Sequence, residues 1–270
     1  MIFFRRGARA ALPGLALAAA AACAPAVPTA PPPPLTRVAP AEAAAALAEA
    51  EASIRTLRGL ADVRLERADA NQRLREAAVL ALPGKLRLET LAFGGATVLI
   101  LATDGERLAI YSLATQEFHH GRASARALAG LTGVAVDPRH LVRLMAGLPP
   151  LAFPAADPRS RLEPEGDGFA AESVEGAFQQ RLRLDAGGGV VGGELRTAAG
   201  LVFTFVFEDP RQVGPRVFPF RLRLEQPGGG RVDLTYRSVE LNLPVDDAVF
   251  SLPLPPGEVR VVDLDAVPPR

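Results

Sequence analysis

Alternating apolar and polar residues predict a β-hairpin between Lys85 and Leu101. In the first arm Leu88 points to one face while Arg87 and Glu89 point to the other, which is the two-residue period of a half-buried strand. The second arm, from Val98 onwards, is apolar at every position. That arm is therefore expected to be covered on both faces, or to face an apolar cavity.

The turn of this hairpin is apolar, because Leu91, Ala92 and Phe93 precede Gly94 and Gly95. Turns lie in water and usually carry polar residues. Two interpretations follow. Either Phe93 folds back onto its own sheet, or Phe93 and Leu91 contact something apolar outside the protein, such as a membrane.

Similar alternation, interrupted by turn signals such as Pro83-Gly84, predicts strands along most of the chain. The expected strands are 61–67, 75–82, 86–91, 97–103, 107–112, 170–175, 179–185, 190–197, 201–208, 218–226 and 231–241, with a further candidate at 258–263. Short strands at such regular spacing are typical of an antiparallel meander.

Two segments have the period of a helix instead. The first begins at Ala41 and is expected to end at Gly59, with an apolar stripe made of Ala43, Leu47, Ala50, Ile54 and Leu57. The second has Asp137 as its N-cap and Pro138 at its first position, and it ends at Gly147. Its apolar stripe consists of Leu141, Leu144, Met145 and Leu148.

A sheet of ten or eleven antiparallel strands does not stay flat, because strands twist relative to their neighbours. With two or three helices to cover it, the expected fold is α+β, a strongly curved antiparallel half-barrel around an apolar cavity. The domain is expected to span residues 41–244, followed by a Pro-rich tail at 245–270 that contains the candidate last strand.

Several apolar side chains on these strands and helices either pack the core or line a lipid-sized cavity, and the pattern alone leaves both interpretations open. The candidates for the cavity wall are Val98, Ile100, Leu141, Leu144, Met145, Phe203, Phe205 and Phe207.

The N-terminus has the parts of an export signal at residues 1–22, with Arg5, Arg6 and Arg9 ahead of an Ala/Leu-rich run. Cys23 follows the run and is the only cysteine, so it cannot form an internal disulfide. The position resembles the acylated cysteine of bacterial lipoproteins; cleavage at a nearby A-x-A site, or retention of the segment as an anchor, are the alternatives. Residues 23–40 would then be a lipidated cysteine and a Pro-rich tether.

Charge gives no support for nucleic-acid binding. The whole chain has 30 basic and 30 acidic residues, and removing the signal removes three arginines, which leaves a net charge of −3. In the bacterial lipoproteins that this N-terminus resembles, the residue after the acylated cysteine directs sorting. Ala24 at that position implies sorting to the outer membrane.

No pattern in the sequence supports catalysis or a cofactor. Gly187, Gly189 and Gly192 form a G-x-G-x-x-G, but no helix follows, so a hairpin turn is predicted rather than a dinucleotide site. Adjacent His119 and His120 on an extended segment point to opposite faces, which does not suit a shared metal. No serine lies in a G-x-S-x-G elbow.

The segment from Leu131 to Pro150, L-T-G-V-A-V-D-P-R-H-L-V-R-L-M-A-G-L-P-P, resembles the outer-membrane lipoprotein receptor family LolB of the LolA/LolB superfamily. The L-T-G opening and the G-L-P close carry the resemblance, which covers most of residues 60–242. The chain departs from the family in its long Pro-rich tether and in the tail beyond Asn242, which is more like the end of LolA.

The resemblance implies a half-barrel whose cavity accepts the acyl chains of lipoproteins from a LolA-like periplasmic carrier and releases the cargo into the inner leaflet of the outer membrane. It implies a monomer without a cofactor, and it places Phe93 at a protruding turn. The tail and tether leave room for a paralogue with another lipid cargo. Two further alternatives use the same fold. One is a periplasmic regulator that senses lipids or lipoproteins, and the other is a structural envelope lipoprotein in which the apolar face is only core.

Overall fold

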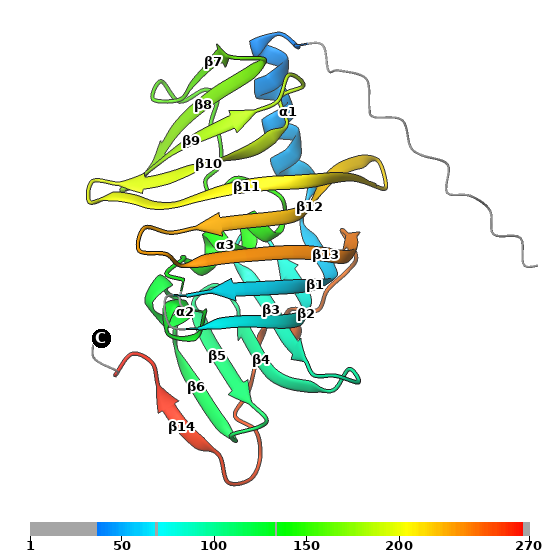
Figure 1. Ribbon diagram of the computed structural model, residues 1–270, viewed down its shortest axis with the longest axis vertical. Helices are drawn as coiled ribbons and strands as arrows, with labels where there is room; N and C mark the ends of the chain where they lie inside the picture. Colours follow the sequence, from blue (N-terminus) through cyan, green and yellow to red (C-terminus); the bar gives the residue numbers. More distant parts are fainter. Residues whose placement is uncertain (1–36, 68–69, 133, 267–270) are drawn as a thin grey trace, which may run out of the picture. The chain divides into compact units, whose positions relative to one another are not determined.

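The structure, a computed structural model, describes residues 37–67, 70–132 and 134–266 (Figure 1). These residues contain fourteen strands and three α-helices. The α-helices are α1 (Pro40–Ser53), α2 (Ala125–Thr132) and α3 (Pro138–Met145), and a 3₁₀ turn, η1, spans Asp247–Phe250. The strands are β1 (Thr56–Glu66), β2 (Asn71–Ala81), β3 (Lys85–Leu91), β4 (Thr97–Thr103), β5 (Arg107–Ser112), β6 (Glu117–Arg122), β7 (Arg161–Glu165), β8 (Gly168–Glu175), β9 (Phe178–Leu184), β10 (Val190–Thr197), β11 (Gly200–Val213), β12 (Arg216–Glu225), β13 (Arg231–Leu241) and β14 (Arg260–Asp263).

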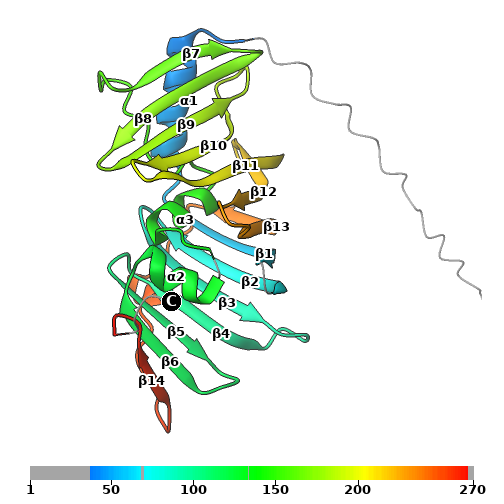
Figure 2. The ribbon, with the colours of Figure 1, turned by 60° about the vertical axis from the view of Figure 1, so that its left-hand side comes forward.

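All the described strands belong to one open sheet, in the order β14-β6-β5-β4-β3-β2-β1-β13-β12-β11-β10-β9-β8-β7. Strands β1 to β6 and β7 to β13 are two antiparallel meanders, and pairing of β1 with β13 joins them into one sheet. The last strand, β14, pairs in parallel with β6. The sheet curves, and the helices lie along it (Figures 1 and 2).

The core lies on one face of the sheet, as the alternation requires. On β12, Phe220 and Leu222 are buried whereas Arg221 and Arg223 point outward and pair with acidic side chains. Buried side chains of both meanders join those of all three helices in a single apolar cluster. Covering this face is therefore what the helices contribute to the fold.

Helix α1 is shorter than the pattern predicts, since it ends at Ser53 rather than near Gly59. Ile54 is extended, and Leu57 lies in β1 opposite Leu80. Both side chains are buried in the core. The apolar spacing therefore continues beyond Ser53, although the backbone there is extended rather than helical.

Helix α3 begins as predicted. The Asp137 carboxylate accepts a hydrogen bond from the Arg139 N–H, and Pro138 occupies the first turn. At its other end, the Tyr236 hydroxyl of β13 donates to the carbonyl oxygen of Met145 at 2.8 Å. Gly147 follows with φ +72°, a conformation that favours glycine. The helix is thus fixed to the sheet at its C-terminal end.

An ion pair joins α3 to α1. The guanidinium of Arg143 is buried, and its two Nη atoms contact both carboxylate oxygens of Glu51 at 2.5 and 2.6 Å. The Arg143 Nε donates to the carbonyl oxygen of Pro149 at 2.8 Å. One side chain therefore connects two helices and the segment that leaves α3.

The predicted curved half-barrel is confirmed, although the described residues contain more strands than the ten or eleven expected. The additional strands are β6 and β7, which the pattern did not predict, and β14, which was the candidate at 258–263; all three are short and lie at or next to the ends of the sheet. Because β14 pairs with β6, part of the tail at 245–270 belongs to the sheet. The predicted signal at 1–22, Cys23 and the tether up to residue 36 lie outside the described residues.

Replacing Arg143 by alanine is expected to lower the free energy of unfolding by about 2–3 kcal/mol, because Glu51 and the Pro149 carbonyl lose a charged partner. Urea unfolding followed by circular dichroism measures the change. Arg159→Ala is the control, since Arg159 pairs with Asp157 in water and its loss should change nothing measurable. Equal midpoints for the two variants would contradict the structural role of Arg143.

Candidate functional site

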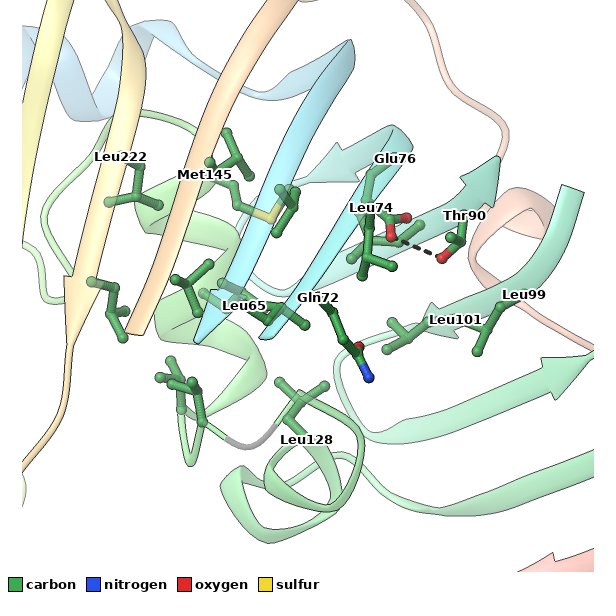
Figure 3. Close-up of a pocket in the computed structure, with 18 of the residues that line it drawn as sticks. Leu65, Gln72, Leu74, Glu76, Thr90, Leu99, Leu101, Leu128, Met145 and Leu222 are labelled. Atoms are coloured by element: carbon green, nitrogen blue, oxygen red, sulfur yellow. Dashed lines mark hydrogen bonds between the residues drawn. The ribbon is translucent and has the colours of Figure 1, made fainter. Parts of the chain in front are cut away.

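An apolar cavity of about 360 Å³ lies on the inner face of the sheet (Figure 3). Strands β1 to β5, β12 and β13 form one wall, and α2, α3 and the link between them form the other. Its lining consists of Val63, Leu65, Gln72, Leu74, Glu76, Leu88, Thr90, Val98, Leu99, Leu101, Ser112, Ala114, Leu128, Val134, Val136, Leu141, Met145, Leu222, Leu224, Val232 and Leu234.

The link between α2 and α3 is held over the cavity by the turn that joins β12 to β13. The Gln226 side-chain oxygen accepts from the Ala135 N–H, and its amide nitrogen donates to the Ala135 carbonyl oxygen, both at 2.8 Å. This two-sided contact directs the flanking Val134 and Val136 into the cavity. The Gly133 of the predicted L-T-G opening, and the side chains of the two residues before it, lie outside the described residues.

Three of the side chains predicted for the cavity wall, Val98, Leu141 and Met145, do line it. Ile100 does not. Its neighbours Leu99 and Leu101 face the cavity instead, because successive side chains of a regular strand point to opposite faces. Val98 also lines the cavity because the pairing of β3 with β4 shifts by one residue at this position.

Four other predicted residues are core rather than cavity wall. Leu144 and Phe203 are fully buried, and Phe203 lies 6.5 Å from the ring of His140 on α3. Phe205 and Phe207 pack against each other at 5.2 Å between ring centroids. Strand β11 lies farther along the sheet than the strands that line the cavity. There, neighbouring side chains fill the space around these three rings.

Glu76 is the feature of the cavity that the sequence pattern did not reveal. It faces inward from β2, between Leu74 and Ala78, and only 5 % of its surface is exposed. The Thr90 hydroxyl donates to its Oε1 at 2.8 Å (Figure 3). Burial raises the pKa of the Glu76 carboxyl to about 7, and the bond from Thr90 offsets only part of that effect.

Phe93 lies at the tip of the β3–β4 turn and is fully exposed, so the interpretation in which it folds back onto the sheet is wrong. Gly94 and Gly95 follow with φ of +94° and +87°, which allows the tight turn and leaves the ring outside. Leu91, at the base of the turn, is half-buried. Contact of either residue with a membrane stays a prediction.

Beneath this turn, the outer face of β1, β2, β12 and β13 carries a groove of about 660 Å³. Its charged lining comprises five arginines and two aspartates, namely Arg64, Arg73, Arg75, Arg221, Arg237, Asp62 and Asp233. Asp62 is shared by Arg237 at 2.7 Å and Arg75 at 3.3 Å. Arg64 and Arg221 also pair with Glu66 and Glu208, which lie outside the lining. An excess of arginines remains, so the groove is weakly electropositive and suits an anionic group better than a cationic one.

The cavity and this outer groove meet where two strands separate. Pairing between β2 and β3 starts at Glu76 and Thr90, whereas residues 71–75 of β2 pair, among the described residues, with β1 only. Val63 and Leu74 border both hollows. Gln72 lines the cavity and is exposed, so the cavity opens toward this end of the sheet.

Several known structures have a similar fold, and one of them is a LolA superfamily protein. A domain named for outer membrane lipoprotein sorting, from Vibrio parahaemolyticus, superimposes with a TM-score of 0.52 at 13% identity, covering 78% of this chain and 97% of that one. A LolA superfamily protein from Nitrosomonas europaea gives 0.50 at 13% identity, with 77% and 97% covered. A DUF1329 family protein from Desulfovibrio piger gives 0.52 at 10% identity, with 78% and 95% covered. At such identities the similarity establishes a LolA-like fold.

At the level of sequence, no protein-family model and no curated protein matches the chain. Within the described residues, no helix has the length and apolar character that a membrane span requires.

The raised pKa of Glu76 predicts how stability depends on pH. The folded carboxyl keeps its proton up to about pH 7, whereas the unfolded one releases it near its ordinary pKa of 4.5. The folded state therefore binds more protons between these values, and stability falls as pH rises through that window. Relative to Glu76→Gln, which does not titrate, the native chain should lose about 3 kcal/mol between pH 4.5 and 7, estimated at 1.36 kcal/mol per pKa unit. Urea titrations of both proteins measure the difference, and a constant difference across this range would contradict the prediction.

Proposed function

We propose that this protein is an outer-membrane lipoprotein which accepts acylated lipoproteins from a LolA-like periplasmic carrier and inserts them into the inner leaflet of the outer membrane. The apolar cavity on the inner face of the sheet is the observation that carries the proposal. The LolA-like fold supports it, because a similar fold occurs in a domain named for lipoprotein sorting.

The cavity suits an acyl chain in composition and in size. Its lining is mostly apolar, so a chain transferred into it leaves water and contributes about 0.8 kcal/mol per buried CH₂. Its volume lies near the lower limit of the roughly 300–1,000 Å³ that is usual for ligand pockets. One chain, or part of one, is the expected content.

Transfer through such a cavity requires no reaction. The acyl chains move between carrier, cavity and bilayer according to relative affinity, so we propose a transport role without catalysis, metal or cofactor. The lipid anchor at Cys23 would hold the protein at the outer membrane, where several acyl chains together give stable attachment.

The Phe93 turn would direct the cavity toward the bilayer. It lies over the electropositive groove, close to the place where the cavity opens between β2 and β3. An exposed ring enters the membrane interface, while arginines of the groove lie at the level of anionic headgroups. Both features favour the same orientation of the protein on the membrane.

Depletion in cells tests the function directly. Loss of the protein should leave other lipoproteins in the inner membrane or bound to the periplasmic carrier, as measured by fractionation and acyl labelling. Correct sorting after depletion, together with a stable complex with a regulatory protein, would instead support the sensor that uses the same fold. Correct sorting without such a complex would favour an envelope lipoprotein with another lipid cargo.

Leu141→Trp should fill the cavity from α3 and reduce acyl uptake at least tenfold while the fold is retained. Native mass spectrometry of the protein, after incubation with a carrier loaded with lipoprotein, counts the bound cargo. Val217→Trp is the matched control, because Val217 is 69% exposed and lies outside the cavity lining. Equal uptake by the two variants would place the acyl chains elsewhere.

Phe93→Glu should leave folding and cargo uptake unchanged and weaken membrane contact. Burying a phenylalanine in the interface contributes about 1.5–3 kcal/mol, so vesicle binding should fall roughly tenfold or more. Cosedimentation with vesicles containing anionic lipid measures it, in a Cys23→Ser background that removes the anchor. Val217→Glu introduces the same charge on an exposed apolar residue away from this turn, and an equal loss for both variants would show a general charge effect instead.

A further inference from the structure

Glu76 is the only ionisable residue among the described side chains that line the apolar cavity. It lies in a row of the sheet between Ala61 on β1 and Thr90 on β3, where an aliphatic side chain would continue the pattern of Leu74, Ala78 and Leu80. A carboxyl group at such a position is costly unless its oxygens are hydrogen-bonded.

Only one of the two carboxylate oxygens has a hydrogen-bond partner among the described residues. Oε1 accepts the bond from the Thr90 hydroxyl, whereas the buried Oε2 receives no hydrogen bond from the described chain. Gln72 and Ser112, the other polar side chains of the lining, are not bonded to it. Because Glu76 itself borders the cavity, a group that satisfies its free oxygen can come from a molecule inside the cavity.

The position of Glu76 along the cavity adds to this argument. It forms the first pair of β2 with β3, at the point where the strands separate and the cavity approaches the outer groove. An amphiphile whose chain fills the apolar lining has its polar end near such an opening. The free carboxyl oxygen thus lies where the chain of the ligand meets its polar group.

We propose that Glu76 binds an amide N–H next to the acyl chain of the ligand, which makes the cavity selective for amide-linked over ester-linked chains. This inference rests on the proposed acyl-binding function and specifies its ligand. When the carboxyl is ionised, an amide N–H donates to Oε2, whereas an ester offers only acceptors and leaves that oxygen unpaired. A site built to receive a hydrogen bond discriminates strongly against an analogue that lacks the donor.

Two probes that differ in one group test the proposal, namely N-methylhexadecanamide and methyl hexadecanoate. Each is titrated, at pH 8.5, against the full chain carrying Cys23→Ser, by displacement of a fluorescent apolar dye. The quantity compared is the ratio of the two dissociation constants, because it cancels differences in chain burial. In the same background Glu76→Leu should shift this ratio about tenfold toward the ester, the size expected for one hydrogen bond to a charged group.

Two further variants separate this role from general effects. Glu76→Gln keeps an acceptor oxygen and should retain part of the amide preference. Glu89→Leu removes one negative charge from the neighbouring strand, where the Glu89 carboxylate accepts hydrogen bonds from Arg87 and Thr97. This variant should leave the ratio of the two dissociation constants unchanged. A ratio that stays within twofold in Glu76→Leu overturns the proposal even if both probes bind. Failure of both probes to bind any variant overturns the acyl-binding function as well.

Discussion

The apolar inner face of the sheet is larger than the helices that cover it, and this mismatch determines most of the structure. An eight-residue helix such as α2 or α3 is about 12 Å long, and neighbouring strands lie about 4.8 Å apart, so each spans only two or three strands. The longer α1 spans about four by the same measure. Where α1 and α3 pack against the sheet, side chains such as Phe203 fill the core. Over β2 to β4, covering is incomplete, and the cavity is what remains.

Local patterns in the sequence specify the elements better than they specify the site. Alternation predicts most strands, and Asp137 with Pro138 predicts the start of α3, because these signals act over a few residues. Strand β6, with the sequence E-F-H-H-G-R, was missed because it barely alternates and its pairing depends on β5 and β14. The face of Phe205 follows from alternation, but which part of that face stays open depends on helix placement. Glu76 could have been found, since it shares its parity with the buried Ala78, yet a charged residue in a strand is normally assigned to the solvent side.

The β3–β4 hairpin connects the inner cavity with the outer groove. Thr90 and Val98 line the inner cavity, whereas Leu91 and Phe93 lie over the outer groove, so a change of one residue along the strand moves from one surface to the other. Such closeness is possible because β2 and β3 stop pairing at Glu76. A molecule at the membrane interface and a chain inside the cavity would therefore be separated by little more than the edge of one strand.

Open sheets carry a hazard that closed barrels avoid, because unpaired strand edges invite other chains to add to them. At one end of this sheet, β14 returns from the C-terminal tail and occupies the edge of β6. At the other end, β7 has five residues, R-L-E-P-E, whose charges and Pro164 discourage further pairing. A protein that exposes Phe93 at the tip of a turn needs such protection more than most. Short edge strands at both ends of the sheet therefore limit the length over which a second copy of the chain could add to it.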